Sequence, residues 1–392
     1  MDGSCRRMKT GLDLLEPGML PGPSVALLSH YAAVDRKYRS AATVLREMDG
    51  VELKMLLGPQ HGFRGETQDN MIEWESYIHP GYGIPVLSLY GSTREPDPSV
   101  FRGLDCLVVD LQDVGSRYYT YIYTMAYCLR SCNAAGVPVV ILDRPNPVGL
   151  EVVEGRPLDP DYRSFVGLYR LPVRHGLTIG ESAGLFASVD SLERPVVVKL
   201  EGWDGSALPD DYQWVHPSPN MPTPETALVY VGMCLLEGTN LSEGRGTTKP
   251  FHIFGAPWLD GEVMAEKLND SPWMEGAVLR PHAFIPTFNK HCGELCDGCE
   301  IHVVDAGRFR PLRAAFGILL EAFRFPETRW REPPYEYEYR LMPIDILAGG
   351  SCVRKAVSAG DAGTLMELSR GDPVEHSAAA GDILLYERKF RV

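Results

Sequence analysis

One glycine-rich stretch holds the side chains best suited to acid–base chemistry. Glu237, Glu243 and Arg245 lie within nine residues of the chain, among glycines and hydroxyl side chains. Paired carboxylates are the groups that hydrolyse glycosidic bonds, one as an acid and the other as a base or nucleophile. An ion pair between Glu243 and Arg245 that only stiffens the loop accounts for these residues equally well. Both interpretations therefore stay open.

Three further polar clusters follow short apolar runs at residues 51–57, 107–111 and 137–142. In an open parallel sheet the carboxyl ends of the strands share one edge, where such folds bind ligands. We therefore expect the three clusters to meet at one site, although each could be an ordinary polar loop. They contain Gln60, His61, Arg64 and Glu66, then Arg117, Tyr118 and Tyr121, and then Arg144 and Asn146, while Asp110 ends the second run.

The elements that would position these clusters alternate along the first half of the chain. The apolar runs are rich in Val, Ile and Leu, as expected for strands buried on both faces, and helical patterns at 41–48 and 120–135 lie between them. This alternation predicts a Rossmann-like parallel sheet in a domain of residues 1–213. Residues 214–392 are expected to form an auxiliary α+β domain, with strands at 283–287 and 301–305 and helices at 311–323, 352–359 and 362–369.

Composition narrows the classes of function. The 392 residues carry a formal net charge of −14, which disfavours nucleic acid as a partner. No segment approaches the roughly 20 apolar residues of a membrane span, and the N-terminal residues have no apolar run of signal-peptide length. With nine cysteines, we expect a cytoplasmic protein with free thiols. The sequence does not indicate an oligomeric state.

The cysteine cluster Cys292, Cys296 and Cys299 has a spacing that could hold an iron–sulfur cluster or zinc. The cluster lies late in the chain and precedes a strand, so free and partly buried thiols are the favoured interpretation. The chain has neither the Gly-Lys-Ser/Thr ending of a phosphate-binding loop nor a GxGxxG motif after a strand. We therefore expect no cofactor and no metal.

Several long motifs, in order through most of the chain, resemble the exo-β-N-acetylmuramidase NamZ family, formerly a domain of unknown function. The resembling segments are residues 58–65, 109–123, 142–147, 154–155, 174–181, 217–223, 237–248 and 254–258. The resemblance implies a Rossmann-like domain followed by an auxiliary domain. It also implies a glycoside hydrolase that removes N-acetylmuramic acid from the non-reducing end of peptidoglycan fragments.

One departure from the family bears on mechanism. The family's usual loop reads Pro-Glu-His-Gly, and its glutamate is a leading candidate for the catalytic carboxylate, whereas this chain has Gln60. An amide neither accepts a proton at neutral pH nor serves as a carboxylate nucleophile. Another acid such as Glu66, Glu237 or Glu243 then carries the role, or Gln60 orients the substrate, or the activity is lost.

From these motifs we expect a cleft between the sheet edge and the second domain. His61, Tyr118 and Tyr121 would position a sugar, with His61 also a catalytic candidate, although it could simply bond a loop carbonyl. Arg117, Arg144 or Arg245 would pair with a lactyl carboxylate. Glu237 or Glu243 would be the general acid, with its pKa raised by burial. The other substrate-binding candidates are Gln60, Arg64, Asp110, Asn146, Asn220 and Asn240.

Two other classes of protein compete with this hypothesis. A non-catalytic binding protein for muropeptides or sugars would explain Gln60 directly. A metalloenzyme that uses Cys292, Cys296 and Cys299 is the less favoured alternative.

Overall fold

The computed structural model describes residues 8–69, 71–209, 212–373, 376 and 381–388. Residues 1–7, which entered the expectation about export, lie outside this description. The larger of two sheets has seven strands in the order β3-β4-β2-β1-β5-β6-β7, and all neighbours pair in parallel except β3 with β4. The strands are β1 (Ser24–Ser29), β2 (Glu52–Gly58), β3 (Tyr77–Ile78), β4 (Pro85–Ser88), β5 (Cys106–Asp110), β6 (Val139–Leu142) and β7 (Val196–Val198).

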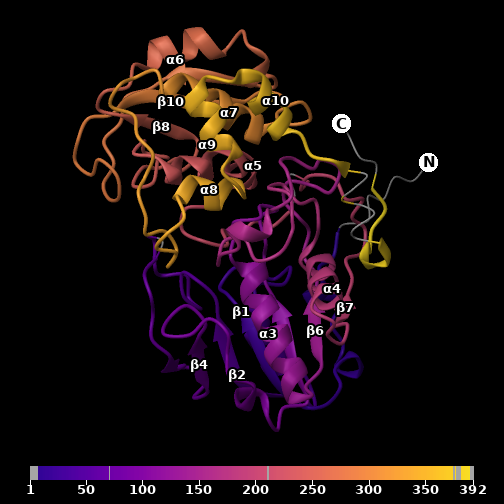
Figure 1. The fold of residues 1–392 in the computed structure, drawn as a ribbon. Helices are drawn as coiled ribbons and strands as arrows, with labels where there is room; N and C mark the ends of the chain where they lie inside the picture. Colours follow the sequence, from indigo (N-terminus) through magenta and orange to yellow (C-terminus); the bar gives the residue numbers. More distant parts are fainter. Residues whose placement is uncertain (1–7, 70, 210–211, 374–375, 377–380, 389–392) are drawn as a thin grey trace.

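Helices cover both faces of this sheet, and Figure 1 shows α3 in front of its strands. Leu28 and Val109 face one core together with the long helix α3, whereas their neighbours Leu27 and Val108 face a second core together with α2. Because both faces are buried, the strands read as continuous apolar runs in the sequence. The helices of this unit are α1 (Gly11–Leu14), α2 (Ala41–Glu47), α3 (Tyr121–Ala135) and α4 (Ile179–Val189). The expected Rossmann-like architecture is confirmed.

The second unit contains a three-stranded antiparallel sheet in the order β8-β10-β9. Its strands are β8 (Ile253–Ala256), β9 (Ala277–Pro281) and β10 (Asp297–Val303). Its helices are α5 (Pro224–Met233), α6 (Gly261–Leu268), α7 (Pro311–Ala322), α8 (Pro343–Ala348), α9 (Cys352–Ala359) and α10 (Ala362–Ser369). Short 3-10 helices are η1 (Pro17–Met19), η2 (Pro98–Phe101), η3 (Pro160–Tyr162), η4 (Cys234–Gly238), η5 (Pro272–Met274) and η6 (Gly381–Ile383).

One strand differs from the sequence prediction. The strand expected at 283–287 is instead β9 at 277–281, because β10 pairs with that earlier segment. Residues beyond it run past the first residue of β10, so only an isolated bridge between Phe284 and Cys296 forms there. The mixed α+β character of this unit is as expected. The boundary placed at residue 213 stays a prediction.

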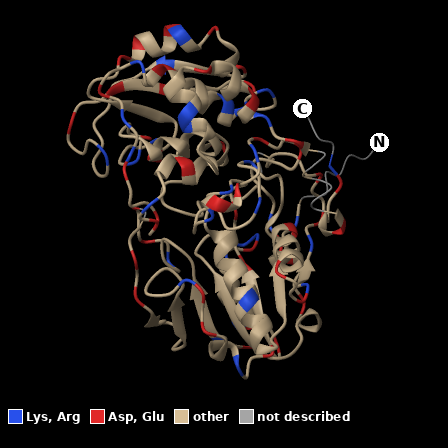
Figure 2. Cartoon of the chain, viewed as in Figure 1, with Lys and Arg blue, Asp and Glu red and all other residues tan. Residues whose placement is uncertain are grey.

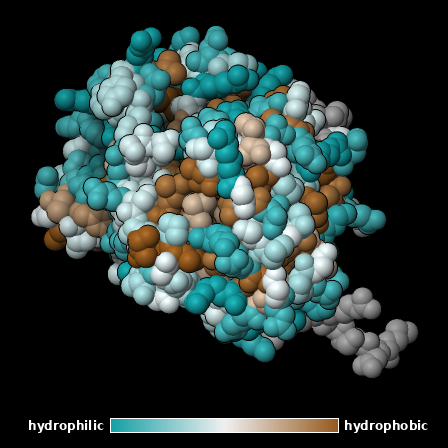
Figure 3. Space-filling view, turned by 90° about the horizontal axis from the view of Figure 1, so that it is seen from below, coloured by the Kyte–Doolittle hydropathy of each residue, from teal (hydrophilic) through white to brown (hydrophobic). Residues whose placement is uncertain are grey.

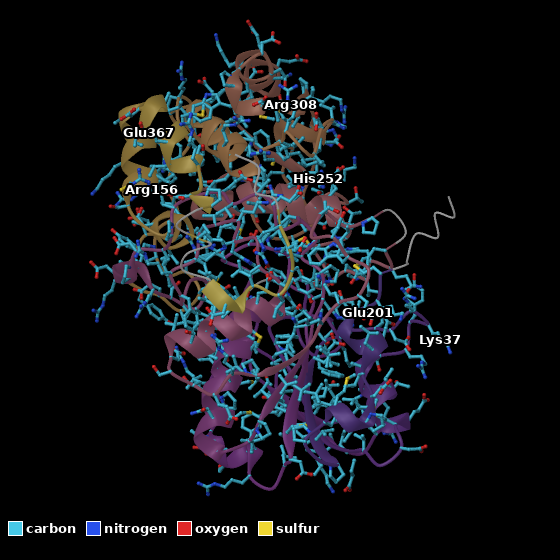
Figure 4. The ribbon with its side chains drawn as sticks, turned by 90° about the vertical axis from the view of Figure 1, so that its right-hand side faces the viewer. Lys37, Arg156, Glu201, His252, Arg308 and Glu367 are labelled. Atoms are coloured by element: carbon cyan, nitrogen blue, oxygen red, sulfur yellow. The ribbon has the colours of Figure 1, made fainter. Side chains whose placement is uncertain are left out.

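Segments from the two halves of the chain interlock. The Glu154 carboxylate accepts a hydrogen bond of 3.2 Å from the backbone N–H of Leu312, at the start of α7. In Figure 4, Arg156 lies beside the α10 helix that carries Glu367, although the two residues are far apart in sequence. The carboxyl ends of the parallel strands therefore face a second unit that is held firmly above them.

Charged residues of both signs occur throughout the chain. Figure 2 shows acidic and basic residues interspersed over both units. Figure 3 views the end of the molecule farthest from the second unit, where apolar side chains gather among polar ones. Within the described part of the chain, no helix is both long and apolar enough to cross a membrane.

Candidate active site at the junction of the two units

A pocket with about 470 Å³ of empty space lies where the larger sheet meets the second unit. The loop after β2 contributes Gln60 and His61, and the segment that begins α3 contributes four consecutive residues, 118–121. The second unit closes the pocket with Tyr230, Glu237, Arg245, Phe251, Tyr335 and Glu336, and residues 218, 220 and 221 complete the lining together with Val166. The clusters after β2 and β5 therefore meet, as the parallel sheet predicted.

His61 is a fixed, neutral wall of this pocket. Its backbone φ is +70°, and its Nδ1 lies 2.8 Å from the carbonyl oxygen of Thr67. A carbonyl accepts only, so Nδ1 carries the proton and Nε2 is left as an acceptor. Burial lowers the pKa of His61 to about 4, so the ring is uncharged at neutral pH. The loop-carbonyl bond that the sequence left open for His61 is confirmed.

Gln60 joins the two units through hydrogen bonds. Its Oε1 accepts a 2.8 Å bond from the hydroxyl of Thr120, the N-cap residue of α3. Its Nε2 donates to the Tyr90 hydroxyl at 3.2 Å and to Oε1 of Glu336 at 3.5 Å. The amide therefore presents a donor to a carboxyl group of the second unit.

Glu336 is a buried carboxyl group that the sequence analysis missed. It is 5% exposed, and its Oε2 accepts a 2.8 Å bond from the Tyr90 hydroxyl. Burial raises its pKa to about 7, and the negative charge of Glu237 acts in the same direction. Glu336 is therefore a carboxyl group that can hold or release a proton near neutral pH.

Glu237 has the opposite character. Burial pushes its pKa upward, but the charge and hydrogen bond of Arg245 and the hydrogen bond from Tyr335 outweigh burial, so its pKa lies below the ordinary value. Arg245 Nη2 is 2.7 Å from Oε1 and the Tyr335 hydroxyl is 2.8 Å from Oε2. The expectation of a raised pKa for Glu237 is therefore wrong, because Arg245 is buried beside it and stabilises the ionised form.

Glu243 also lies in an ion-pair network. Its Oε1 is 3.2 Å from Nε of Arg245 and its Oε2 accepts a 2.9 Å bond from Lys290. It lines a neighbouring, larger cavity of about 1000 Å³ rather than the pocket itself. The two cavities adjoin, because Glu237 lines both. The loop-stiffening ion pair that the sequence left open for Glu243 and Arg245 is thus present.

The tyrosines of the second cluster serve both the pocket and the framework. Tyr118 and Tyr121 line the pocket, while their hydroxyls donate to the backbone carbonyls of Val231 and Pro217. Tyr123 is fully buried in the core and donates to the carbonyl of Arg117. Tyr118 and Tyr121 thus present rigid aromatic surfaces to a ligand.

Two of the expected arginines lie outside the pocket. Arg117 is fully buried and donates to three backbone carbonyls, those of Arg156, Leu171 and Leu347. Arg144 pairs with the buried Asp110, with Nη2 and Oδ2 2.9 Å apart. Both cations satisfy groups that the fold itself buries, so neither is available to a lactyl carboxylate in the pocket.

The remaining candidates divide by position. Asn146 is buried and bonds the carbonyl of Leu177, so it organises its own loop. Arg64 and Glu66 are exposed and do not line the pocket. Asn220 lines it and donates to the carbonyl of Gln68, whereas Asn240 lines the neighbouring cavity. Neither Arg144 nor Asn146 of the third cluster lines the pocket, because both bond other residues of the unit that contains the larger sheet.

The cysteine cluster does not converge. Cys292 is exposed, while Cys296 and Cys299 are buried, and each thiol contacts a different backbone carbonyl, of Thr287, Glu294 and Gly261 respectively. Among the residues that the structure describes, no group of three His, Cys, Asp or Glu side chains is placed to hold a metal ion. The geometry therefore gives the metalloenzyme hypothesis no support.

The residues around the second carboxyl group, Tyr90, Tyr335 and Glu336, went unrecognised in the sequence, as did Val166, Tyr230 and Phe251 of the pocket lining. For Tyr335 and Glu336 the available signal is the run Pro-Pro-Tyr-Glu-Tyr-Glu-Tyr at 333–339, since three tyrosines so close together carry much apolar surface that favours burial. Nothing local, however, tells which of its glutamates is buried.

Comparisons with known proteins agree with this architecture. The family models for the exo-β-N-acetylmuramidase NamZ N-terminal and C-terminal domains match residues 25–225 and 228–386. The peptidoglycan β-N-acetylmuramidase NamZ of Bacillus subtilis (strain 168) is 41% identical over 361 residues, which cover 90% of this chain and 85% of the relative.

Two crystal structures of DUF1343 family proteins from Bacteroides fragilis NCTC 9343 share the fold. One has a TM-score of 0.84 at 30% identity and the other a TM-score of 0.73 at 25% identity, and each alignment covers 97% of this chain and 99% of the other. With both family models matched across nearly the whole chain, the protein belongs to the exo-β-N-acetylmuramidase NamZ family.

Proposed function

We propose that this protein is an exo-acting glycosidase that removes N-acetylmuramic acid, or a closely related amino sugar, from the non-reducing end of peptidoglycan fragments. The observation that carries the proposal is the pair of buried carboxyl groups, Glu237 and Glu336, in one tyrosine-lined pocket. Their surroundings push their pKa values in opposite directions. Such a pair supplies one ionised carboxylate and one proton-bearing carboxyl group at the same pH, as glycoside hydrolysis requires.

The arrangement of the two adjoining cavities supports exo-action. The amino sugar would bind among the tyrosines of the pocket, and the rest of the fragment would extend into the adjoining, larger cavity, with which the pocket shares Glu237. The name of the Bacillus subtilis relative, a peptidoglycan β-N-acetylmuramidase, supports the same class of substrate. We further propose a cytoplasmic site of action, which the eight free cysteines among the described residues favour.

Arg245 is the proposed partner of the lactyl carboxylate. It is the arginine of our three candidates that lines the pocket, and the other two are engaged elsewhere. Arg245 pairs with Glu237 and Glu243, and Lys290 adds a second cation at Glu243, so a substrate carboxylate would join a network of two cations and two carboxylates. The lactyl group would then bind close to the ionised Glu237.

A binding protein without catalysis is the second candidate, and Gln60 is the observation that favours it. The amide stands where the family loop has a carboxylate, so one potential catalytic group is missing. Glu336, within hydrogen-bonding distance of that amide, returns a carboxyl group to the same part of the pocket. Hydrolysis is therefore the better-supported function.

The test compares two chromogenic substrates that differ only in the lactyl ether: p-nitrophenyl β-N-acetylmuramide and p-nitrophenyl β-N-acetylglucosaminide. The full-length protein should release nitrophenol from the first and much more slowly from the second. Thermal stabilisation by N-acetylmuramic acid with no turnover of either glycoside would instead identify a binding protein.

A further inference from the structure

A tight turn of the second unit carries Glu336 into the pocket. Tyr335 and Glu338 exchange two backbone hydrogen bonds of 2.9 Å, and the two residues between them, Glu336 and Tyr337, have φ values of +45° and +67°. Turns of this kind favour glycine or asparagine at both central positions. A glutamate and a tyrosine at these positions therefore cost conformational energy. Strained backbone of this type concentrates at functional sites, where the surrounding structure holds it in place.

The groups around the Glu336 carboxyl come from both units. Tyr90 and Gln60 donate hydrogen bonds to its two oxygens from the larger sheet. The charge of Glu237 opposes ionisation from within the second unit, and the charge of Arg94, in the loop after β4, favours it. No cation contacts Glu336 among the ion pairs of the described residues, whereas Glu237 has Arg245 at 2.7 Å.

We propose that Glu336 is the general acid of the glycosidase, an assignment that rests on the proposed function. Its carboxyl proton passes to the glycosidic oxygen as the bond from that oxygen to the anomeric carbon breaks, and the bonding electron pair leaves with the oxygen. Water then supplies the hydroxyl group of the released sugar, and its remaining proton returns to Glu336. Protons and electrons balance without any further reactant.

The hydrogen-bond donors around Glu336 suit this role. The Tyr90 hydroxyl and the Gln60 amide both favour the charged form of Glu336, so they stabilise the carboxylate that remains after proton transfer. Gln60 provides this donor because it is an amide. A glutamate at position 60 would place a second carboxyl group in contact with Glu336. With Gln60 in that position, Glu336 is the acidic member of the contacting pair.

The assignment is tested through the leaving group. A sugar leaving group needs protonation, whereas dinitrophenolate leaves readily without it. Wild type and Glu336→Gln are therefore compared on the disaccharide N-acetylmuramyl-N-acetylglucosamine and on dinitrophenyl β-N-acetylmuramide. We expect the variant to lose about 10²–10⁴-fold in kcat/KM on the disaccharide. The loss on the dinitrophenyl glycoside should be less than about tenfold, since that reaction does not need the acid.

The matched control is Glu332→Gln, the same chemical change at an exposed glutamate of the same segment. It should leave both rates unchanged. Glu336→Asp retains an acid on a shorter stem, so it covers the case in which the amide does not fold, and it should show the same contrast between the two substrates.

The possible outcomes separate this inference from the function on which it rests. Equal losses of Glu336→Gln on both substrates, or full activity on the disaccharide, would overturn the assignment while leaving the glycosidase function standing. A wild-type protein that hydrolyses neither N-acetylmuramide would overturn the proposed function, and the assignment with it.

Discussion

The hydroxyl group of Tyr90, which follows strand β4, donates a 2.8 Å hydrogen bond to the carboxyl group of Glu336 on the second unit. Both residues are buried, and they are separated by 246 positions in the sequence. The bond therefore makes the protonation of Glu336 depend on how the two units fit together. It also offers a way to shift the pKa of Glu336 without removing the carboxyl group.

Replacing this hydroxyl, as Tyr90→Phe, should move the basic limb of the pH profile. The hydroxyl favours the charged form of Glu336, so its loss raises the pKa of Glu336 above its value of about 7. An acid with a higher pKa keeps its proton to higher pH, so the basic limb of kcat/KM should shift upward by roughly one pH unit. A lower rate with an unmoved limb would contradict this role for Tyr90.

Tyr335→Phe provides the complementary change on the other carboxyl group. The Tyr335 hydroxyl bonds Glu237 at 2.8 Å and favours its ionised form, so its removal raises the pKa of Glu237. Glu237 must be ionised to act, and the acidic limb should therefore move upward by roughly one pH unit, while the basic limb stays in place. A shift of the basic limb alone would reverse the roles assigned to the two carboxyl groups.

Much of the larger sheet could be predicted, because its strands are buried on both faces and carry continuous apolar runs. The helix pattern at 120–135 corresponds to α3, which ends at Gly136 with a φ of +70°. The loop after β2 could be predicted to meet the start of α3, because the carboxyl ends of parallel strands share one edge of the sheet. In the second unit, the helices at 352–359 and 362–369 were predicted with the observed bounds.

The site was harder to predict because burial and partners decide the chemistry of a side chain. Arg117 is indistinguishable in sequence from a ligand-binding arginine, yet the fold surrounds it with three carbonyls. Glu336 lies in a turn with left-handed backbone, and neither central residue of that turn is the glycine or asparagine that would have indicated it in the sequence. Its contacts with Gln60 and Tyr90 span more than 240 residues, so no local pattern encodes them.

The structural assignment of Arg117 predicts a loss of stability without a loss of function. Arg117→Lys replaces a planar fork by a single ammonium group, which cannot reach three separated carbonyls, and should lower the free energy of unfolding by about 2–4 kcal/mol. Urea denaturation measures this loss. Below the melting temperature, kcat/KM should match that of wild type. The control Arg163→Lys, at an exposed position, should stay within about 0.5 kcal/mol of wild type. A raised KM for the N-acetylmuramide in Arg117→Lys would return this residue to the site.

The burial of Glu336 should lower the free energy of unfolding at high pH. The pKa of Glu336 is raised from 4.5 to about 7 in the folded protein, so the folded state binds its proton more tightly than the unfolded state does. The resulting stabilisation is complete below about pH 4.5 and is lost as the pH rises through about 7. Glu336→Gln removes this dependence while keeping the shape of the side chain.

Relative to wild type, Glu336→Gln should therefore be more stable by on the order of 2–3 kcal/mol at about pH 8, and the difference should shrink toward zero near pH 4 to 5. Urea denaturation at both pH values measures the difference, in which titrating groups that do not interact with Glu336 cancel. Glu332→Gln, at an exposed glutamate, should show no such trend. A gain in stability that is equal at both pH values would mean that relief of packing, rather than the proton, separates the variant from wild type. A stability difference that grows toward low pH would show that the folded protein prefers ionised Glu336, and the general acid would then have to be sought elsewhere in the pocket.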